Sequence, residues 1–346
     1  MKRTKTITVG KLTFGGGAPV SVQSMTNTKT ADVSATLAQI KRLTAAGCEV
    51  VRLAVPNMES VRGFAKVREQ TEIPMVADIH FDYRLALESV AAGADKIRIN
   101  PGNIGGDERV RQIAAACTQK GLPIRIGVNG GSLERDILAK FGHTPQAMVE
   151  SAMRHVALLN RFDFDDICLS VKSSGVADTV AAYRMLHERT SYPLHLGVTE
   201  AGTAYMGTIK NAIGIGSLLL DGIGDTIRVS LTADPVEEVR AGRAVLQAIG
   251  LRQFGPTLIS CPTCGRCEVD LIPIAKEVEV QLAGMDCAIT VAVMGCAVNG
   301  PGEASYADFG IAAGRDEGLL FRYGEIVGKV PQENLVDALM ALIKPS

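Results

Sequence analysis

Five of the eight cysteines in this 346-residue chain lie beyond residue 260. Cys261 and Cys264 form a C-x-x-C pair, which places two thiolates on one tight turn so that both can reach one metal centre. Cys296 follows an apolar, strand-like run and precedes the loop Asn299-Gly-Pro-Gly, whose backbone can approach a metal cluster closely. These three thiolates are compatible with an iron–sulfur cluster, a zinc site or a redox dithiol.

The spacing alone does not assign the other cysteines near this group. A structural zinc ion would need a fourth ligand, which either Cys267 or Cys287 could supply. No histidine follows His195, which excludes a zinc site with two cysteines and two histidines. The remaining cysteines lie within apolar helix or strand patterns, and we interpret them as packing residues: Cys48, Cys117 and Cys168.

Basic residues interrupt five otherwise apolar, strand-like segments: Arg52, Arg98, Arg125, Lys172 and Arg228. A cation in such a strand costs several kcal/mol unless it is paired, hydrogen-bonded or open to water. Too few acidic residues lie nearby in the sequence to pair with all five. Because Arg forks and Lys ammonium groups suit phosphate oxygens, the pattern predicts a cationic cup that binds a small polyanion. The alternative is that each cation pairs with an acid on an outer helix.

Polar residues accompany these cations near the ends of the same segments. Asn129, Thr199 and Ser230 are further candidates for contacts with the anion. Glu200 follows a strand end beside Thr199, where a carboxylate can contact substrate, donate a proton or orient a cation. His80 is a candidate for the same roles, and a purely structural histidine at the rim is the alternative interpretation.

A repeated pattern of short apolar strand, turn and amphipathic helix begins at Val20 and occurs eight times. The expected strands are Val20–Ser24, Glu49–Val55, Met75–Ile79, Lys96–Asn100, Ile124–Val128, Asp166–Val171, Leu194–Val198 and Thr226–Ser230. The expected helices include Asp32–Ala46, Asp107–Lys120, Pro145–Asn160 and Val236–Ile249, with Asp32 and Thr144 as N-caps.

Alternating strands and helices indicate an α/β protein with a parallel sheet. Eight such units in roughly 230 residues favour a closed (β/α)₈ TIM-type barrel over an open doubly wound sheet. No G-x-G-x-x-G motif opens the first helix, which removes the usual dinucleotide-binding reason to prefer the open sheet. A hairpin over Thr6–Phe14 is expected to plug the bottom of the barrel. Barrel enzymes carry their chemistry at the opposite end, where the strands finish.

The strand and helix repeat stops near Gly250, so we predict two domains. Residues 1–250 would form the barrel, and residues 251–346 would form a small α+β domain that carries the cysteine group.

Composition narrows the function further. With 36 basic and 37 acidic residues the formal charge is −1, so nothing global attracts nucleic acid or an anionic membrane. No apolar run reaches the roughly 18 residues that span a bilayer, and the N-terminus lacks the apolar core of a signal peptide. We therefore expect a cytoplasmic protein, in which reduced cysteines serve as metal ligands or packing residues rather than disulfides.

Two motifs carry a resemblance to a known family. Ser260-Cys-Pro-Thr-Cys-Gly-Arg266 and Val293-Met-Gly-Cys-Ala-Val-Asn-Gly-Pro-Gly-Glu-Ala304 closely resemble the 4-hydroxy-3-methylbut-2-en-1-yl diphosphate synthases of the non-mevalonate isoprenoid pathway. The likeness extends over essentially the whole chain, including Val22-Gln-Ser-Met-Thr-Asn-Thr28, and is to the shorter, two-domain bacterial form.

The resemblance implies an iron–sulfur oxidoreductase. Its substrate would be 2-C-methyl-D-erythritol 2,4-cyclodiphosphate, and two-electron reductive ring opening with loss of water would give (E)-4-hydroxy-3-methylbut-2-enyl diphosphate. By motif position the ligands of a [4Fe–4S] cluster would be Cys261, Cys264, Cys296 and Glu303, with Cys267 as a bystander. Glu303, a weaker ligand than thiolate, would exchange with the substrate's C3 oxygen on the unique iron, which acts as a Lewis acid.

The resemblance also implies which residues of the cationic cup bind the substrate and which partners the chain has. The cyclic diphosphate would bind Arg52, Arg98, Arg125, Lys172, Arg228 and Ser230, with Asn129, Thr199 and His80 as further contacts and Glu200 as a catalytic residue. Electrons would come from a flavodoxin or ferredoxin. The resemblance implies a homodimer in which the cluster domain of one subunit caps the barrel of the other, and the sequence leaves capping within one chain as the alternative.

Two other functions remain possible at this point. One is a pterin- or folate-type barrel transferase whose tail holds only a structural zinc. The other is an iron–sulfur electron carrier or regulatory protein without its own substrate, against which the five strand cations argue.

Overall fold

The computed structural model describes residues 3–296, 302 and 304–344. The chain divides into two compact units, Met1–Arg252 and Gln253–Ser346, and the division lies close to the expected boundary after residue 250. Each unit has its own sheet, so each is described separately. Glu303, the expected fourth cluster ligand, lies outside the described residues.

Eight parallel strands form the sheet of the first unit, in the order β8-β7-β6-β5-β4-β3-β10-β9. A parallel bridge between Leu169 of β8 and Leu194, just before β9, brings the two edges together and nearly closes the ring. The predicted (β/α)₈ barrel is therefore confirmed, and the open sheet is wrong. The strands are β3 (Ser21–Met25), β4 (Val50–Ala54), β5 (Met75–Asp78), β6 (Lys96–Ile99), β7 (Ile124–Asn129), β8 (Ile167–Lys172), β9 (His195–Leu196) and β10 (Thr226–Ile227).

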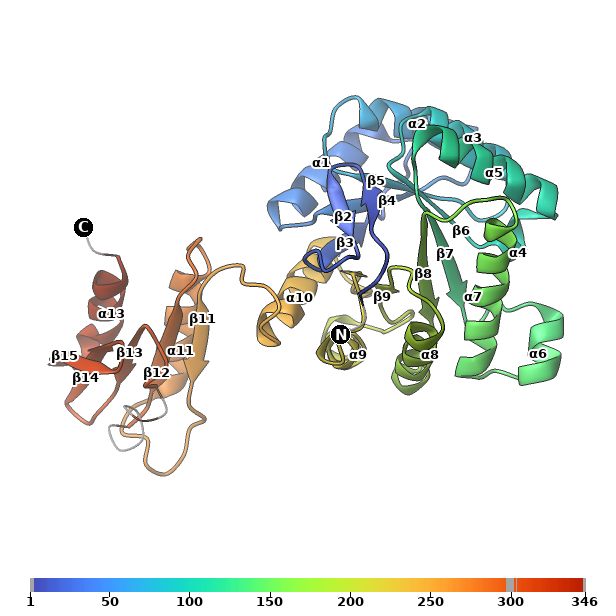
Figure 1. Cartoon of the computed structure of the whole chain (residues 1–346). Helices are drawn as coiled ribbons and strands as arrows, with labels where there is room; N and C mark the ends of the chain where they lie inside the picture. Colours follow the sequence, from blue (N-terminus) through green and yellow to red (C-terminus); the bar gives the residue numbers. More distant parts are fainter. Residues whose placement is uncertain (1–2, 297–301, 303, 345–346) are drawn as a thin grey trace. The chain divides into compact units, whose positions relative to one another are not determined.

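Helices surround these strands on the outside (Figure 1). They are α1 (Val33–Ala45), α2 (Met58–Arg68), α3 (Tyr83–Ala91), α4 (Pro101–Ile104), α5 (Asp107–Lys120), α6 (Arg135–Phe141), α7 (Pro145–Asn160), α8 (Val176–Arg189), α9 (Ala204–Leu220) and α10 (Pro235–Ala248). The two expected N-caps are confirmed, because the Asp32 carboxylate accepts from the Ala35 amide at 3.0 Å and the Thr144 hydroxyl from the Ala147 amide at 3.2 Å. The two short helices α4 and α6 interrupt the simple repeat.

Two glycines make room for long side chains inside the barrel. A Cβ atom on Gly127 of β7 would lie 2.6 Å from the Nε of Arg98, and one on Gly197, just after β9, would lie 2.5 Å from the Nζ of Lys172. Side chains two residues apart on a strand share a face, so Lys96 points to the same interior as Arg98. The barrel interior is thus built around cations rather than the branched apolar residues that usually fill it.

A β-hairpin packs against the beginning of the barrel strands. Strands β1 (Ile7–Val9) and β2 (Leu12–Phe14) pair in an antiparallel manner. Their side chains form one buried cluster with residues at or near the starts of β4, β5 and β8: Ile7, Val9, Phe14, Val50, Val76 and Cys168. The hairpin therefore plugs the N-terminal end of the barrel, as the sequence predicts.

The second unit is a five-stranded mixed sheet with helices, in agreement with the expected α+β class. Its strands follow the order β11 (Thr257–Ser260), β12 (Thr290–Met294), β13 (Phe309–Ala312), β14 (Glu317–Arg322) and β15 (Glu325–Pro331). The first three are parallel and the last two are antiparallel to their neighbours. Helices α11 (Leu271–Leu282) and α13 (Leu335–Ile343) contribute to a core that includes Val278, Val293, Ile311 and Leu339.

Across the described parts of the chain, every helix is too short or too polar to cross a membrane.

Candidate active site

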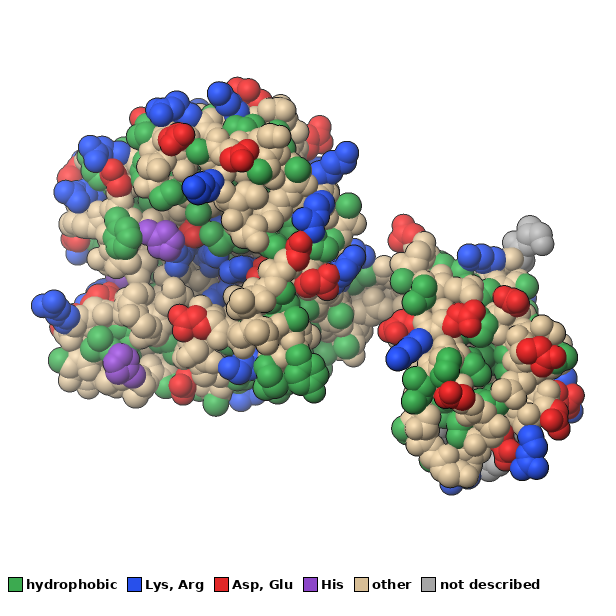
Figure 2. All heavy atoms as spheres, turned by 180° about the vertical axis from the view of Figure 1, so that it is seen from behind, with side chains coloured by type: hydrophobic (Ala, Val, Ile, Leu, Met, Phe, Trp, Pro, Cys, Tyr) green, Lys and Arg blue, Asp and Glu red, His purple; other side chains and the backbone are tan. Residues whose placement is uncertain are grey.

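A cavity of about 240 Å³ opens at the C-terminal ends of the barrel strands, and we call it the cup. Figure 2 shows basic side chains inside a hollow of the barrel unit. The structure brings together in the cup all nine residues that the sequence assigned to substrate contacts: Arg52, His80, Arg98, Arg125, Asn129, Lys172, Thr199, Arg228 and Ser230. Asp78, Ser170 and Val198 complete its lining.

Asp78, at the end of β5, organises one side of the cup. Its side chain is only 3% exposed, and its oxygens lie 3.0 Å from the Nη1 of Arg98 and 3.6 Å from the Nε of Arg52. The Nε2 of His80 lies 3.4 Å from the same carboxylate. Burial raises the pKa of Asp78, but Arg52, the His80 hydrogen bond and Arg98 outweigh it and hold that pKa well below its usual range. The carboxylate therefore stays ionised and orients both guanidinium groups.

Arg228 has an acidic partner from an outer helix. Its Nη2 donates to the Oε1 of Glu238, on the first turn of α10, at 3.1 Å. Glu238 also accepts from the Leu231 amide at 3.0 Å, so this carboxylate fixes the loop after β10. The alternative interpretation of pairing with an outer helix is correct for Arg228. The sequence did not identify Glu238, because an acid in a first helical turn is common wherever helices begin.

The other two cations are less well compensated. Arg125 donates through Nη1 to the Ser170 hydroxyl at 2.9 Å, while its Nε and Nη2 have no hydrogen-bond partner among the described residues. Burial, followed by repulsion from Arg98, lowers the pKa of Arg125 to about 10. Burial and the four surrounding guanidinium groups lower the pKa of Lys172 well below its usual range. When all groups are ionised, Asp78 and Glu238 balance two of the five cations, which favours an anionic ligand.

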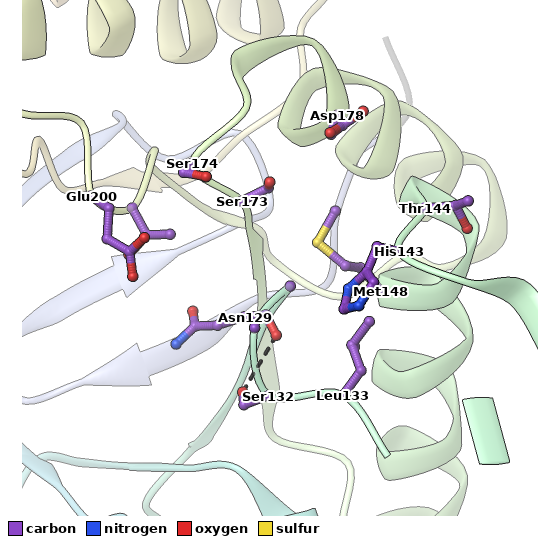
Figure 3. Close-up of a pocket in the computed structure, with 13 residues that line it drawn as sticks. Asn129, Ser132, Leu133, His143, Thr144, Met148, Ser173, Ser174, Asp178 and Glu200 are labelled. Atoms are coloured by element: carbon purple, nitrogen blue, oxygen red, sulfur yellow. Dashed lines mark hydrogen bonds between the residues drawn. The ribbon is translucent and has the colours of Figure 1, made fainter. Parts of the chain in front are cut away.

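A second cavity of about 450 Å³ adjoins the cup, since Asn129 and Thr199 line both. Figure 3 shows Asn129 and Glu200 on one side of this pocket and His143, Thr144 and Met148 on the other. Glu200 is exposed and adopts a left-handed backbone with φ of 52°. Non-glycine residues hold this conformation at some cost, often at functional sites. The structure thus places the predicted catalytic carboxylate beside the cup.

Two of the expected cluster ligands follow the ends of neighbouring strands in the second sheet. Cys261 follows β11 and Cys296 follows β12 after Gly295, and these strands are parallel neighbours with Ser260 opposite Val293. The Gly295 amide donates to the Sγ of Cys261 at 3.2 Å, the kind of hydrogen bond that ligand sulfurs accept in iron–sulfur proteins. Cys264 is exposed on the intervening loop. The partial exposure of these thiols is typical of cluster ligands rather than of cysteines packed in a core.

Cys267 lies against the backbone next to Cys296. A Cβ atom on Gly295 would lie 2.4 Å from the Cys267 Sγ, and the Glu268 amide donates to the Gly295 carbonyl at 3.0 Å. Cys287 is exposed in the segment between α11 and β12. In the described ranges, no three His, Cys, Asp or Glu side chains converge closely enough to hold a single metal ion. The three cysteines interpreted as packing residues are buried: Cys48, Cys117 and Cys168.

Solved structures share the fold of the chain at low sequence identity. An N-acetylneuraminic acid synthetase from Leptospira borgpetersenii matches with a TM-score of 0.51 at 12% identity, over 81% of this chain and 97% of that one. A dihydropteroate synthase from Yersinia pestis, solved with a sulfonamide drug complex, matches with a TM-score of 0.50 at 15% identity, over 72% of this chain and 100% of that one. These likenesses concern the fold alone and do not favour the transferase alternative.

Sequence comparisons identify a family as well as a fold. A family model described as the GcpE TIM-barrel domain matches residues 4–243, and one described as the GcpE protein C-terminal domain matches residues 257–345. A relative from Geobacter sulfurreducens, named 4-hydroxy-3-methylbut-2-en-1-yl diphosphate synthase (flavodoxin), is 58% identical and covers 99% of this chain and 97% of its own length. One of the same name from Clostridium perfringens is 55% identical over 99% of both chains.

The resemblance seen in the two cysteine motifs is therefore confirmed along the whole chain, which belongs to the GcpE family of 4-hydroxy-3-methylbut-2-en-1-yl diphosphate synthases.

Proposed function

We propose that this chain reduces 2-C-methyl-D-erythritol 2,4-cyclodiphosphate to (E)-4-hydroxy-3-methylbut-2-enyl diphosphate. The reaction opens the ring at the carbon–oxygen bond to one phosphate and releases a neighbouring hydroxyl as water. It consumes two electrons and a proton. Membership of the family supports the reaction, and the shape and charge of the cup support the substrate class.

The observation that carries this proposal is the concentration of charge in the cup. Four cations on strands β4, β6, β7 and β8, together with Arg228 just after β10, line a cavity of about 240 Å³, and the two nearby carboxylates compensate only two of these five. A cluster of buried cations with too few compensating carboxylates is costly in the free protein, and a small polyanion relieves the cost. A cyclic diphosphate supplies that charge in a compact molecule.

Each part of the cup then has a distinct role. Arg52 and Arg98, held by Asp78, present planar forks to one phosphate, and fork geometry favours two parallel hydrogen bonds to phosphate oxygens. Arg125 and Lys172 offer donors that no other described residue uses. Arg228 is positioned by Glu238, and the remaining donors to the diphosphate and its hydroxyls are His80, Asn129, Thr199 and Ser230.

We assign to Glu200 the donation of the proton with which the leaving hydroxyl departs as water. Its side chain lines the pocket that adjoins the cup, beside Thr199 and across from His143. This position lets its carboxyl group exchange protons with water and deliver one to a hydroxyl of a substrate held by the cations.

The cysteine unit is assigned to a [4Fe–4S] cluster held by Cys261, Cys264, Cys296 and Glu303. When bound, such a cluster supplies electrons one at a time and a Lewis-acidic iron. The Gly295 amide, through its hydrogen bond to the Cys261 sulfur, stabilises negative charge on that ligand. Cys267 supports the loop from outside the ligand set through its contact with Gly295.

Flavodoxin is the proposed electron donor, because the relatives carry that donor in their names. A homodimer in which one cluster domain caps the other subunit's barrel remains part of the proposal. The reaction is assigned to the cytoplasm, where cysteine ligands stay reduced.

The first test is anaerobic purification with quantification of iron and sulfide, and an absorption spectrum. We expect about four iron and four sulfide per chain. Cys296→Ala should lose most of both, together with turnover of the cyclic diphosphate by a chemical reductant, because one of three thiolate ligands is removed. Cys287→Ala is the matched control, since this exposed cysteine lies outside the ligand set.

Zinc without sulfide in the purified protein would contradict the cluster. A full cluster in Cys296→Ala would contradict the assignment of this ligand. Iron and sulfide in the expected ratio without any turnover of the cyclic diphosphate would contradict the substrate.

A further inference from the structure

Two ionisable side chains lie below the cup, on the inward face of the same strands. Lys96 is two residues before Arg98 on β6, and His195 begins β9 two residues before Gly197. Both residues are 0% exposed. Neither the Nζ of Lys96 nor either ring nitrogen of His195 has a hydrogen-bond partner in the described part of the chain. Buried polar atoms are rarely left in this state without a reason.

Among the described residues, no carboxylate balances the charge of Lys96. Its Nζ lies 4.4 Å from the centroid of the Phe14 ring, on the hairpin that plugs the barrel. The titratable groups that act on it are Cys168 of β8, Arg125 of β7 and Arg52 of β4. Burial, the largest effect, lowers the pKa of Lys96 to about 7, and the two guanidinium groups act in the same direction.

His195 is surrounded in the same way. Burial lowers its pKa well below the usual range, and repulsion from cations on the neighbouring strands adds to this effect: Arg125, Lys172, Lys96 and Arg52. The Tyr183 hydroxyl of α8 donates to the His195 backbone carbonyl at 2.5 Å, which fixes the strand but leaves the imidazole ring without a partner. Near pH 8 the free protein therefore keeps His195 neutral and Lys96 mostly neutral.

Arg125 connects this lower layer with the cup. Its guanidinium lines the cup and also repels both Lys96 and His195. An anion that pairs with Arg125 cancels part of that repulsion and adds attraction of its own. Both changes favour the protonated forms of the two groups below.

We propose that Lys96, on the buried floor that it forms with His195 beneath the cup, takes up a proton when a diphosphate binds to Arg125 and Lys172. The proton comes from solvent and forms a new N–H bond on the Lys96 amine, while the His195 imidazole stays neutral, with no change in oxidation state. The floor then contributes positive charge only when the ligand is present. This inference rests on the proposed function, because it requires the cup to be a diphosphate site.

The test measures proton uptake when inorganic pyrophosphate binds to the full-length, cluster-loaded protein. Calorimetry at pH 8 in two buffers of different ionisation enthalpy gives the number of protons exchanged. Lys96→Met should take up about half a proton less than the wild type. By linkage, the pyrophosphate affinity of the wild type should fall more steeply than that of Lys96→Met as the pH rises from 7 to 9. The ligand's own ionisation is common to both proteins and cancels.

Lys140→Met is the matched control, because Lys140 also lies over a phenylalanine ring, at 4.9 Å from its centroid, but is exposed. It should leave proton uptake unchanged. Lys96→Gln is the second variant, and it should lower the uptake by the same amount. Lys96→Met is expected to fold, since it removes a buried amine that has no hydrogen-bond partner among the described residues and keeps an apolar side chain against the Phe14 ring.

Three outcomes separate the two hypotheses. Equal proton uptake and equal pH slopes in the wild type, Lys96→Met and Lys96→Gln would overturn the floor while leaving the cup intact. If Lys96→Met does not fold, unchanged uptake in Lys96→Gln overturns it. Absence of pyrophosphate binding to the wild type would instead overturn the cup.

Discussion

Lys172 is a single residue that lowers the stability of the free barrel and strengthens the binding of an anion. Its ammonium group is buried in the cup, and in the described part of the chain it has neither a hydrogen bond nor an ion pair. Such a group destabilises the free protein, because burial disfavours its charge without compensation. The same group gives a bound phosphate a donor that has no competing partner.

Lys172→Met should therefore separate binding from stability. We expect pyrophosphate affinity to fall about ten- to a hundredfold, the loss of one charged hydrogen bond, while the melting temperature stays level or rises. Titration calorimetry and thermal unfolding measure the two quantities. Lys140→Met, at an exposed position, should change neither. Lower stability with unchanged affinity would assign Lys172 to the fold alone.

The residues of the cup differ in how well a single sequence reveals them. Arg98 was found because a cation in an apolar strand is conspicuous. Lys96 could have been found by counting two residues back from Arg98, since both share a strand face. Glu238 left no such signal, because only the folded barrel brings the first turn of α10 to Arg228. Long-range pairing of this kind is fixed by tertiary structure.

At the scale of the element, the glycines of the barrel strands act as spacers for the cations. Gly127 of β7 faces the guanidinium of Arg98, and the three heavy atoms nearest to an added Cβ all belong to that side chain, with Nε at 2.6 Å. Gly197 is more restricted, because its Cβ would also lie 2.5 Å from the backbone carbonyl oxygen of Arg228. The strand sequence thus sets the position of each neighbouring cation.

Gly127→Ala should displace Arg98 from Asp78 and lower pyrophosphate affinity about tenfold, with a stability cost of about 1–3 kcal/mol from overpacking. Calorimetry and denaturant unfolding provide the two numbers. Gly106→Ala is the matched control, because its Cβ meets nothing within 4 Å and its φ is −52°. Unchanged affinity in Gly127→Ala would show that Arg98 does not contribute to anion binding.

Sequence periodicity predicted the helices better than the last strands. The helices Asp107–Lys120 and Pro145–Asn160 were predicted to the residue. The strands expected at Leu194–Val198 and Thr226–Ser230 are only His195–Leu196 and Thr226–Ile227. Their remaining residues continue into the cup, where Val198, Arg228 and Ser230 line the cavity. The strand-like pattern of side chains extends beyond the residues that pair as regular strands. The pattern alone therefore predicts strands that are too long.

At the scale of the whole molecule, two units with separate cores divide the chemistry between anion binding and the cysteine group. The end of the first unit is well fixed, because Arg252 donates to the Val20 carbonyl at 2.9 Å and to Glu49 at 2.7 Å. A unit with its own core and a fastened end meets the usual conditions for independent folding.

A fragment ending at Arg252 should fold, bind pyrophosphate and contain no iron. A fragment ending at Ala248 should be less stable by about 1–3 kcal/mol, because it lacks the Arg252 contacts. Circular dichroism, calorimetry and metal analysis test these expectations. An unfolded longer fragment would show that the barrel depends on the second unit.

The hairpin of β1 and β2 also has a kinetic consequence. With Ile7, Val9 and Phe14 packed against the start of the barrel, that end is closed in the described part of the chain, and the cup opens at the C-terminal ends of the strands. Substrate must arrive, and product and water must depart, by the same route. A product that keeps its diphosphate occupies the cations of the cup until it leaves. The next substrate therefore binds only after product release.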